Sequence, residues 1–180
     1  MPIVTGPIFW IFGYSGAGKS TLAEALTRSL RSRGIAVLEL DGDDLRTGLC
    51  QGLGFSDSDR TENLRRAAEV ARLGANSGLC VVASFITPLE SQRRLIEKII
   101  GRDRLSMIFA DAPLDVCRQR DVKGLYAKAR TGMLTQMTGI SSAFDQPPNP
   151  DLRLPTAGCT QAETAQILIA FALTRLGQIQ

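Results

Sequence analysis

The sequence predicts an α/β fold in which a parallel β-sheet is covered by helices on both faces. Short apolar runs alternate with longer segments of helical period, and a glycine-rich turn joins the first run to the first helix. The 180 residues, 44% of them hydrophobic and 22% charged, are enough for a sizeable core. We therefore expect one domain over residues 1–180, without internal repeats.

Each element of this fold has its own pattern. The predicted strands are the apolar runs at residues 8–12, 36–40, 79–84 and 105–111. Helical patterns follow at residues 19–33, 56–77, 89–100 and 114–120. In the first helix Leu22, Leu26 and Leu30 share one face, which predicts packing against the sheet. A last helix is expected to begin at Thr160, because Thr160 and Glu163 have capping-box spacing.

Residues 121–151 form a long segment without a clear pattern. This segment contains Gly124, Gly132 and Gly139, and three prolines lie near its end. It is too long for an ordinary connection in a compact domain. We expect it to be a mobile lid or a binding loop.

Composition excludes several classes of partner and location. The net charge is +3, and the basic residues are scattered among acidic ones, so no nucleic-acid partner is indicated. No apolar run approaches the roughly 18 residues that span a bilayer, and the N-terminus lacks the features of a signal peptide. We expect a cytoplasmic protein with no membrane partner.

Cysteine and histidine usage limits the chemistry. Cys50, Cys80, Cys117 and Cys159 lie far apart, which argues against a zinc site and a disulfide framework. The chain has no histidine, the commonest general base. Acid or base chemistry must therefore use carboxylates, Lys, Tyr or Cys.

The glycine-rich turn carries the strongest motif. Residues 13–20, GYSGAGKS, match the P-loop pattern G-x-x-x-x-G-K-[ST] between a predicted strand and a predicted helix. Glycines let backbone N–H groups wrap a phosphate, Lys19 neutralises the β- and γ-phosphate oxygens, and Ser20 can ligate Mg²⁺. The predicted nucleotide-binding residues here are Gly13, Ser15, Gly16, Ala17, Gly18, Lys19, Ser20 and Thr21. The motif predicts a nucleoside triphosphate but does not separate a kinase from a GTPase or a motor.

Carboxylates follow the second predicted strand at Asp41 and Asp43. The carboxyl ends of parallel strands border the crevice where α/β sheets bind ligands, so both side chains are expected to face the γ-phosphate. A hydroxyl acceptor would need such a carboxylate to orient it and to take its proton. The alternative is a solvated turn or a helix cap.

These segments together resemble one enzyme family. GYSGAGKST, LELDGDDLRTGL, LGFSDSDRTENLRRAAEVARL, SFITP, RDVKGLYAKAR and TGI, in this order, are similar to the segments of adenylyl-sulfate kinases. The resemblance covers roughly residues 7–160. It implies a P-loop kinase, a homodimer, that uses ATP with Mg²⁺. Such an enzyme transfers the γ-phosphate to the 3′-hydroxyl of adenosine 5′-phosphosulfate, giving 3′-phosphoadenylyl sulfate and ADP.

The resemblance also implies residue roles. Asp41 is the expected base, Asp43 lies beside it near the metal, and Lys19 acts on the transferred phosphate. Arg120 and Cys159 lie near the ATP adenine. The acceptor-binding residues would be Asp41, Asp43, Arg46, Phe55, Arg60, Asn63, Ile86, Thr87, Lys123, Gly124, Leu125 and Met137.

Residue chemistry agrees with these roles but leaves alternatives. Guanidinium groups suit phosphate and sulfate oxygens, and the Phe55 ring can stack on adenine. Phe55 fits a core position equally well, and Cys159 fits a small buried one. Thr87 stands where the family has a serine described as a phosphorylated intermediate. Since no neighbouring residue type would activate Thr87, we expect it to bind substrate instead.

The chain departs from the family pattern at a few positions. Asp44 replaces Asn, Thr87 replaces Ser, and Gln136 and Met137 replace Gly-Phe. Met137 supplies apolar area but no ring face, so weaker acceptor binding is expected. Two other functions therefore stay open: a P-loop kinase for another nucleotide or small hydroxyl substrate, and an ATP-binding regulatory module without turnover.

Overall fold

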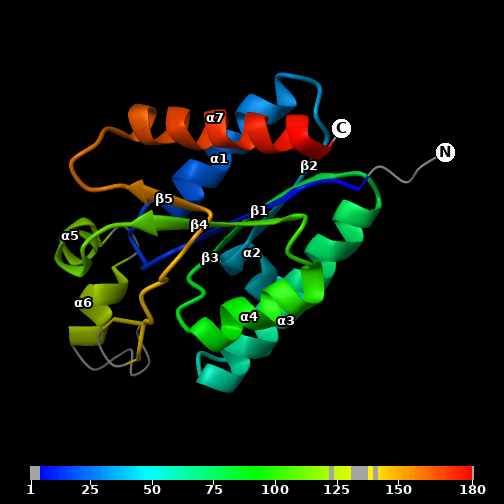
Figure 1. The fold of residues 1–180 in the computed structure, drawn as a ribbon. Helices are drawn as coiled ribbons and strands as arrows, with labels where there is room; N and C mark the ends of the chain where they lie inside the picture. Colours follow the sequence, from blue (N-terminus) through cyan, green and yellow to red (C-terminus); the bar gives the residue numbers. More distant parts are fainter. Residues whose placement is uncertain (1–4, 122–123, 131–137, 140–141, 180) are drawn as a thin grey trace.

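The fold is a five-stranded parallel sheet between two layers of helices (Figure 1). The computed structural model describes residues 5–121, 124–130, 138–139 and 142–179. The strands lie in the order β2-β3-β1-β4-β5. They are β1 (Ile8–Phe12), β2 (Val37–Asp41), β3 (Cys80–Phe85), β4 (Leu105–Asp111) and β5 (Leu152–Pro155). The predicted α/β class is confirmed.

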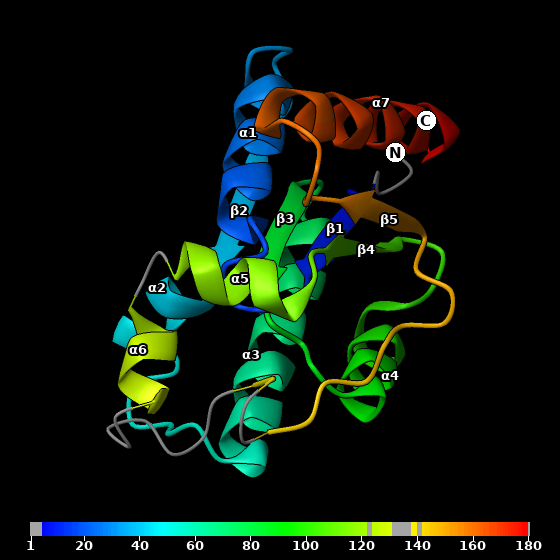
Figure 2. The same cartoon turned by 90° about the vertical axis from the view of Figure 1, so that its left-hand side faces the viewer.

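Helices cover both faces of the sheet. Helices α1 and α7 lie on one face, and α3 and α4 lie on the other (Figure 1). Helices α5 and α6 lie beyond the carboxyl ends of the strands (Figure 2). The helices are α1 (Lys19–Arg31), α2 (Gly42–Thr47), α3 (Asp57–Asn76), α4 (Glu90–Ile100), α5 (Leu114–Arg120), α6 (Leu125–Arg130) and α7 (Gln161–Ile179).

The central strand β1 divides the core into two clusters. All five of its residues are buried, and successive side chains point to opposite faces of the sheet. Phe9 and Ile11 pack with α1 and α7, whereas Ile8, Trp10 and Phe12 pack with α3 and α4. This two-sided burial explains why the strand is a continuous apolar run instead of an alternating one.

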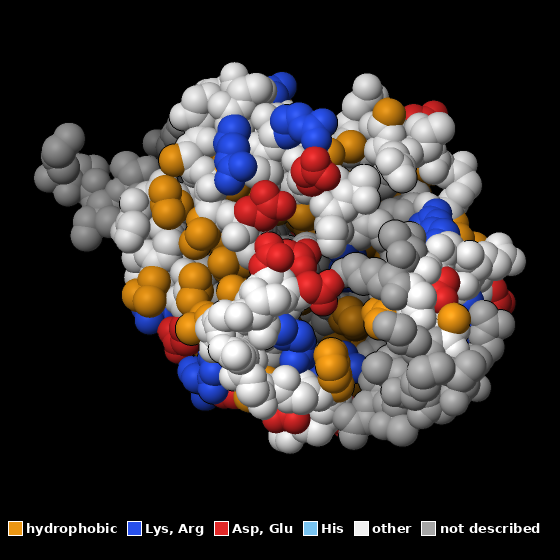
Figure 3. Space-filling model, turned by 180° about the vertical axis from the view of Figure 1, so that it is seen from behind, with side chains coloured by type: hydrophobic (Ala, Val, Ile, Leu, Met, Phe, Trp, Pro, Cys, Tyr) orange, Lys and Arg blue, Asp and Glu red, His pale blue; other side chains and the backbone are white. Residues whose placement is uncertain are grey.

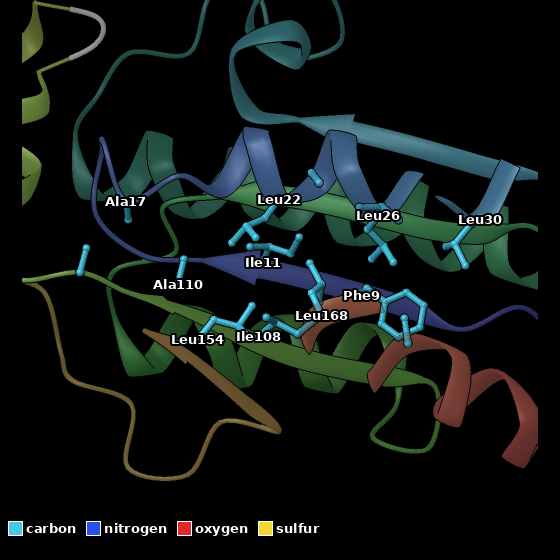
Figure 4. Close-up of a cluster of buried hydrophobic side chains, with 14 of the residues drawn as sticks. Phe9, Ile11, Ala17, Leu22, Leu26, Leu30, Ile108, Ala110, Leu154 and Leu168 are labelled. Atoms are coloured by element: carbon cyan, nitrogen blue, oxygen red, sulfur yellow. The ribbon is translucent and has the colours of Figure 1, made fainter. Parts of the chain in front are cut away.

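The first cluster contains the predicted apolar face of α1. Leu22, Leu26 and Leu30 are buried and point toward Phe9 and Ile11 of β1 (Figure 4). This packing confirms the prediction made from their spacing. It fixes the start of α1, and with it the glycine-rich turn, against the carboxyl end of β1.

The structure also corrects the predicted elements. Helix α2, helix α6 and strand β5 were not predicted, because each is only four to six residues long and too short for a hydrophobic period. Asp41 is the last residue of β2 and does not follow it, and β3 extends to Phe85. Helix α1 ends at Arg31, two residues before the predicted end.

The end of the chain matches its predicted capping box. The Thr160 N–H donates to the Glu163 carboxylate at 2.8 Å, and the Glu163 N–H donates to the Thr160 hydroxyl at 3.2 Å. Helix α7 begins one residue later and continues beyond the predicted apolar run to Ile179. Within the described ranges, no helix is both long and apolar enough to cross a membrane.

Candidate active site

The glycine-rich turn has a backbone that only glycine adopts readily. Gly16 and Gly18 have φ angles of 79° and 88°, in the left-handed region. A side chain at Gly13 would lie 2.6 Å from the Ala110 carbonyl oxygen, which leaves no room for a Cβ. Gly18 is the N-cap of α1, so the loop leads directly to the positive end of that helix dipole.

Asp41 connects the second strand to the P-loop. Its Oδ2 atom accepts hydrogen bonds from the hydroxyls of Ser84, at 2.6 Å, and Ser20, at 3.0 Å. Its Oδ1 atom accepts from the Asp43 N–H at 2.9 Å, which caps α2. Asp41 is therefore a helix cap, which was the alternative to a catalytic role. The same carboxylate also contacts the P-loop through Ser20.

The Ser20 hydroxyl provides a hard oxygen ligand of the kind that Mg²⁺ prefers. In the part of the chain that the structure describes, no three His, Cys, Asp or Glu side chains form a metal-binding group. Mg²⁺ bound with a nucleotide needs only one or two protein oxygens, because phosphates and water supply the rest. The residues present therefore fit a nucleotide-bound Mg²⁺.

A cavity of about 140 Å³ lies on the β2 and α3 side of the P-loop. Of the described residues predicted to bind the acceptor, all except Gly124 line this cavity. They are Asp41, Asp43, Arg46, Phe55, Arg60, Asn63, Ile86, Thr87 and Leu125. Lys123 and Met137 lie outside the described residues.

Phe55 is an exposed ring close to two cations. Its relative exposure is 49%, so it is not a core residue. The Arg46 and Arg60 guanidinium carbons lie 4.5 Å and 5.5 Å from the ring centroid. Burial, and then the nearby charge of Arg46, lower the pKa of Arg60. Two cations and a half-exposed aromatic ring in one cavity suit a ligand with an aromatic base and anionic oxygens.

Asn63 adds a polar atom at the floor of this cavity. The residue is 4% exposed, and its Oδ1 atom has no hydrogen-bond partner among the residues that the structure describes. A buried acceptor without a partner is costly unless a ligand or water supplies a donor. Asn63 is therefore poised to accept a hydrogen bond from a bound molecule.

The loop after β3 closes the cavity through Ile86 and Thr87. The Ile86 carbonyl accepts a hydrogen bond from the Gly13 N–H at 3.2 Å, which joins this loop to the P-loop. Thr87 is buried with a positive φ of 44°. Its carbonyl accepts from the Arg93 guanidinium at 3.2 Å.

A second cavity, of about 570 Å³, lies on the other side of the P-loop, beside α1 and the start of α7. All residues predicted to bind ATP line it except Gly13. Arg120 is held there by hydrogen bonds to the carbonyls of Gly16 and Thr156. Cys159 is exposed, so it does not occupy the small buried position considered above.

The two cavities meet at the P-loop. Ser15, Lys19 and Ser20 line both of them. A phosphate chain bound on one side would therefore end where a molecule on the other side begins. Such a geometry suits direct transfer between two bound ligands.

Sequence reasoning missed several residues at these cavities. Ser84 bonds to Asp41, and Thr156 and Gln161 line the second cavity. Ser84 had a detectable signal, because it is a polar residue near the carboxyl end of a buried apolar strand. No local pattern marks Thr156 or Gln161.

The face shown in Figure 3 has acidic side chains gathered near its middle, with basic side chains above and below them.

Comparison with known proteins gives the family. The sequence profile described as adenylylsulphate kinase matches residues 5–155. The chain belongs to the adenylylsulphate kinase family. It is 46% identical over 168 residues to the adenylyl-sulfate kinase of Marinobacter nauticus, covering 93% of this chain and 84% of that protein. It is 50% identical over 149 residues to that of Prochlorococcus marinus, covering 83% and 74%.

A solved structure of an adenylylsulphate kinase agrees with the fold. The Mycobacterium tuberculosis APS kinase CysC, in complex with AMPPNP and APS, matches with a TM-score of 0.89 and 45% sequence identity. The match covers 94% of this chain and 98% of that chain. The sheet, the helical layers and the P-loop described above are thus those of an adenylylsulphate kinase.

Proposed function

We propose that this chain transfers the γ-phosphate of ATP to the 3′-hydroxyl of adenosine 5′-phosphosulfate. The products are 3′-phosphoadenylyl sulfate and ADP. The observation that carries the proposal is the shared wall of the two cavities, formed by Ser15, Lys19 and Ser20. ATP occupies the larger cavity and the acceptor occupies the smaller one, so the γ-phosphate lies between them.

Phosphate binding is the role of the P-loop. Backbone N–H groups of residues 15–20 and the start of α1 hold the phosphates, and Lys19 compensates the charge that develops on the γ-phosphate. Ser20 would ligate the Mg²⁺ that accompanies ATP, and Asp43 would lie beside it. When bound, Mg²⁺ neutralises charge on the phosphate oxygens.

Proton transfer is assigned to Asp41. Its carboxylate accepts the proton of the 3′-hydroxyl as the new O–P bond forms and the bond from the γ-phosphorus to the bridging oxygen of ADP breaks. Ser84 and the Asp43 N–H hold the carboxylate in place through hydrogen bonds of 2.6 and 2.9 Å. Asp43 is the alternative base, because it lines the same cavity.

Acceptor binding uses the remaining residues of the smaller cavity. The adenine stacks on Phe55, the anionic oxygens meet Arg46 and Arg60, and Asn63 accepts a hydrogen bond from the bound molecule. Ile86, Thr87 and Leu125 complete this side, together with the predicted residues Lys123, Gly124 and Met137. On the ATP side, Arg120 and Cys159 flank the adenine.

We also propose a homodimer in the cytoplasm. The four cysteines are free, and three of them are buried, which suits a reducing compartment. Size-exclusion chromatography with light scattering tests the dimer, and a monomer mass would contradict it.

The deciding experiment measures ADP formation with and without adenosine 5′-phosphosulfate, using the wild-type protein and Lys19→Ala. We expect acceptor-dependent ADP formation in the wild type and its loss in Lys19→Ala. Chromatography of the product should show 3′-phosphoadenylyl sulfate. ADP formation that needs another nucleotide or a small hydroxyl compound would favour the alternative kinase. ATP binding without turnover on any of these acceptors would favour a regulatory module.

A further inference from the structure

Tyr126 is a buried tyrosine outside the P-loop, and its side chain is hydrogen-bonded to the backbone of the P-loop. The Tyr126 hydroxyl on α6 donates to the Ser15 carbonyl oxygen at 3.0 Å. Tyr126 is 1% exposed and packs in the core cluster that includes Ala17 of the P-loop and Cys117 of α5. Burial raises the pKa of Tyr126, so the phenol keeps its proton and remains a donor.

This hydrogen bond fixes the orientation of a peptide plane in the P-loop. The Ser15 carbonyl and the Gly16 N–H belong to one peptide unit, and no described peptide bond is cis. In a planar trans peptide these two groups point in opposite directions. Holding the Ser15 carbonyl toward α6 therefore turns the Gly16 N–H away from α6. Gly16 has a φ of 79° and lines the larger cavity, which is proposed to hold ATP.

The position of Tyr126 is itself fixed by Asp121. The Asp121 carboxylate accepts hydrogen bonds from the N–H groups of Tyr126 and Ala127, each at 2.9 Å. These bonds hold the first turn of α6. The preceding residue, Leu125, lines the acceptor cavity. One short helix thus contacts the acceptor cavity through Leu125 and the P-loop through Tyr126.

We infer that the Tyr126 hydroxyl is a positioning group for phosphoryl transfer: it holds the Ser15–Gly16 peptide so that the Gly16 N–H points at the ATP phosphates. The inference rests on the proposed function. Tyr126 is not a catalytic residue, because its hydroxyl reaches a backbone carbonyl and not the reacting atoms. Its effect on the rate comes through the geometry of the P-loop amide.

The test uses Tyr126→Phe, which removes the hydroxyl and keeps the ring. Because small misplacements of groups that position a reacting phosphate are costly, we expect kcat to fall by about tenfold or more. Ser106→Ala is the matched control. It also removes a buried, hydrogen-bonded hydroxyl, but on β4 far from the P-loop. An equal fall of kcat in Ser106→Ala would overturn the inference.

The peptide orientation can be measured directly by NMR. Ser-Gly occurs in the sequence only at residues 15–16 and 77–78. Protein labelled with carbonyl-¹³C serine and ¹⁵N glycine therefore shows two selected amide signals, from Gly16 and from Gly78. Gly78 lies in the turn between α3 and β3 and is an internal control.

We expect AMPPNP to shift the Gly16 amide signal in the wild type and to shift it much less in Tyr126→Phe. The response of the Gly78 signal to AMPPNP should be the same in both proteins. A wild-type Gly16 response in Tyr126→Phe would overturn the inference, whatever the value of kcat. An unchanged kcat in Tyr126→Phe would overturn it as well. A wild-type protein with no kinase activity would instead contradict the proposed function.

Discussion

The indole Nε1–H of Trp10 donates a hydrogen bond of 2.9 Å to the hydroxyl oxygen of Thr87. The bond joins the central strand of the sheet to the turn that closes the acceptor cavity. A threonine with a φ of 44° is strained, at a cost of about 1–3 kcal/mol, so surrounding contacts must hold it there. Trp10 holds its side chain, and Arg93 holds its carbonyl.

Replacing Thr87 by valine tests this relationship. Valine keeps the β-branched shape but leaves the buried indole N–H without an acceptor, so we expect a loss of about 1–3 kcal/mol in the free energy of unfolding. Thr87→Ser keeps the hydroxyl and should lose less. Urea denaturation followed by fluorescence measures both, because Trp10 is the single tryptophan. Equal stability of Thr87→Val and the wild type would show that the hydrogen bond contributes nothing.

Replacing Asp41 by asparagine tests the proposed base. We expect turnover to fall by roughly a hundredfold or more, the range of general-base catalysis, with ATP affinity retained. Asp44→Asn is the control, because Asp44 is an exposed acid on α2 that does not line either cavity. Steady-state kinetics and calorimetric titration with AMPPNP give the two quantities. Normal turnover in Asp41→Asn would transfer the role to Asp43 or show that no residue acts as the base.

Replacing Phe55 by alanine tests acceptor stacking. Base–aromatic stacking contributes about 1–3 kcal/mol, so the KM for adenosine 5′-phosphosulfate should rise by about tenfold, with the KM for ATP nearly unchanged. Leu73→Ala is matched in exposure, at 56% against 49% for Phe55, and lies outside the cavity. Similar acceptor KM values in the two variants would rule out stacking on Phe55.

Glu62 gives a pH dependence of stability. Hydrogen bonds from Arg65 and then Arg66 lower the pKa of Glu62 from 4.5 to about 2. A lowered folded-state pKa stabilises the protein above the unfolded value, and this stabilisation is lost as the pH falls from 4.5 through about 2. The three side chains are about a third or more exposed, so solvent screening limits the contribution to about 0.5–1 kcal/mol.

Glu62→Gln tests this pH dependence of stability. Glu69→Gln, on the same helix, is its control. Denaturation at neutral pH should show Glu62→Gln to be the less stable of the two. Its difference from the wild type should shrink as the pH falls from 4.5 and vanish below about pH 2, where the wild-type carboxylate is protonated in the folded chain as well as in the unfolded one. A difference that stays constant between neutral and acidic pH would contradict the assignment of this pKa to Glu62.

The predictable part of the fold is the part with buried periodic patterns. Strand β1 is apolar because both its faces are covered, and α1 has its leucines on one face. Strand β5 has a single buried residue, Leu154, and so no pattern to detect. Helix α2 has no buried residue and depends on the Asp41 cap, whose chemistry equally fits a turn.

The same distinction applies to the site. The P-loop was predictable because its conformation is local and requires glycine at Gly16 and Gly18. The partners of that loop come from distant parts of the chain. Ser84 is 43 residues from Asp41, and Tyr126 is 111 residues from Ser15. Contacts at such separations are set by the packing of whole elements, which short sequence patterns do not record.

The shared wall between the two cavities has a consequence for inhibitor design. Since Ser15, Lys19 and Ser20 border both cavities, one molecule can fill both when a phosphate chain crosses that wall. An adenosine polyphosphate joined at its terminal phosphate to the 3′-oxygen of a second adenosine phosphosulfate has this connectivity. Tethering makes the second binding event intramolecular, so such a compound gains affinity from its linker geometry without any new contact.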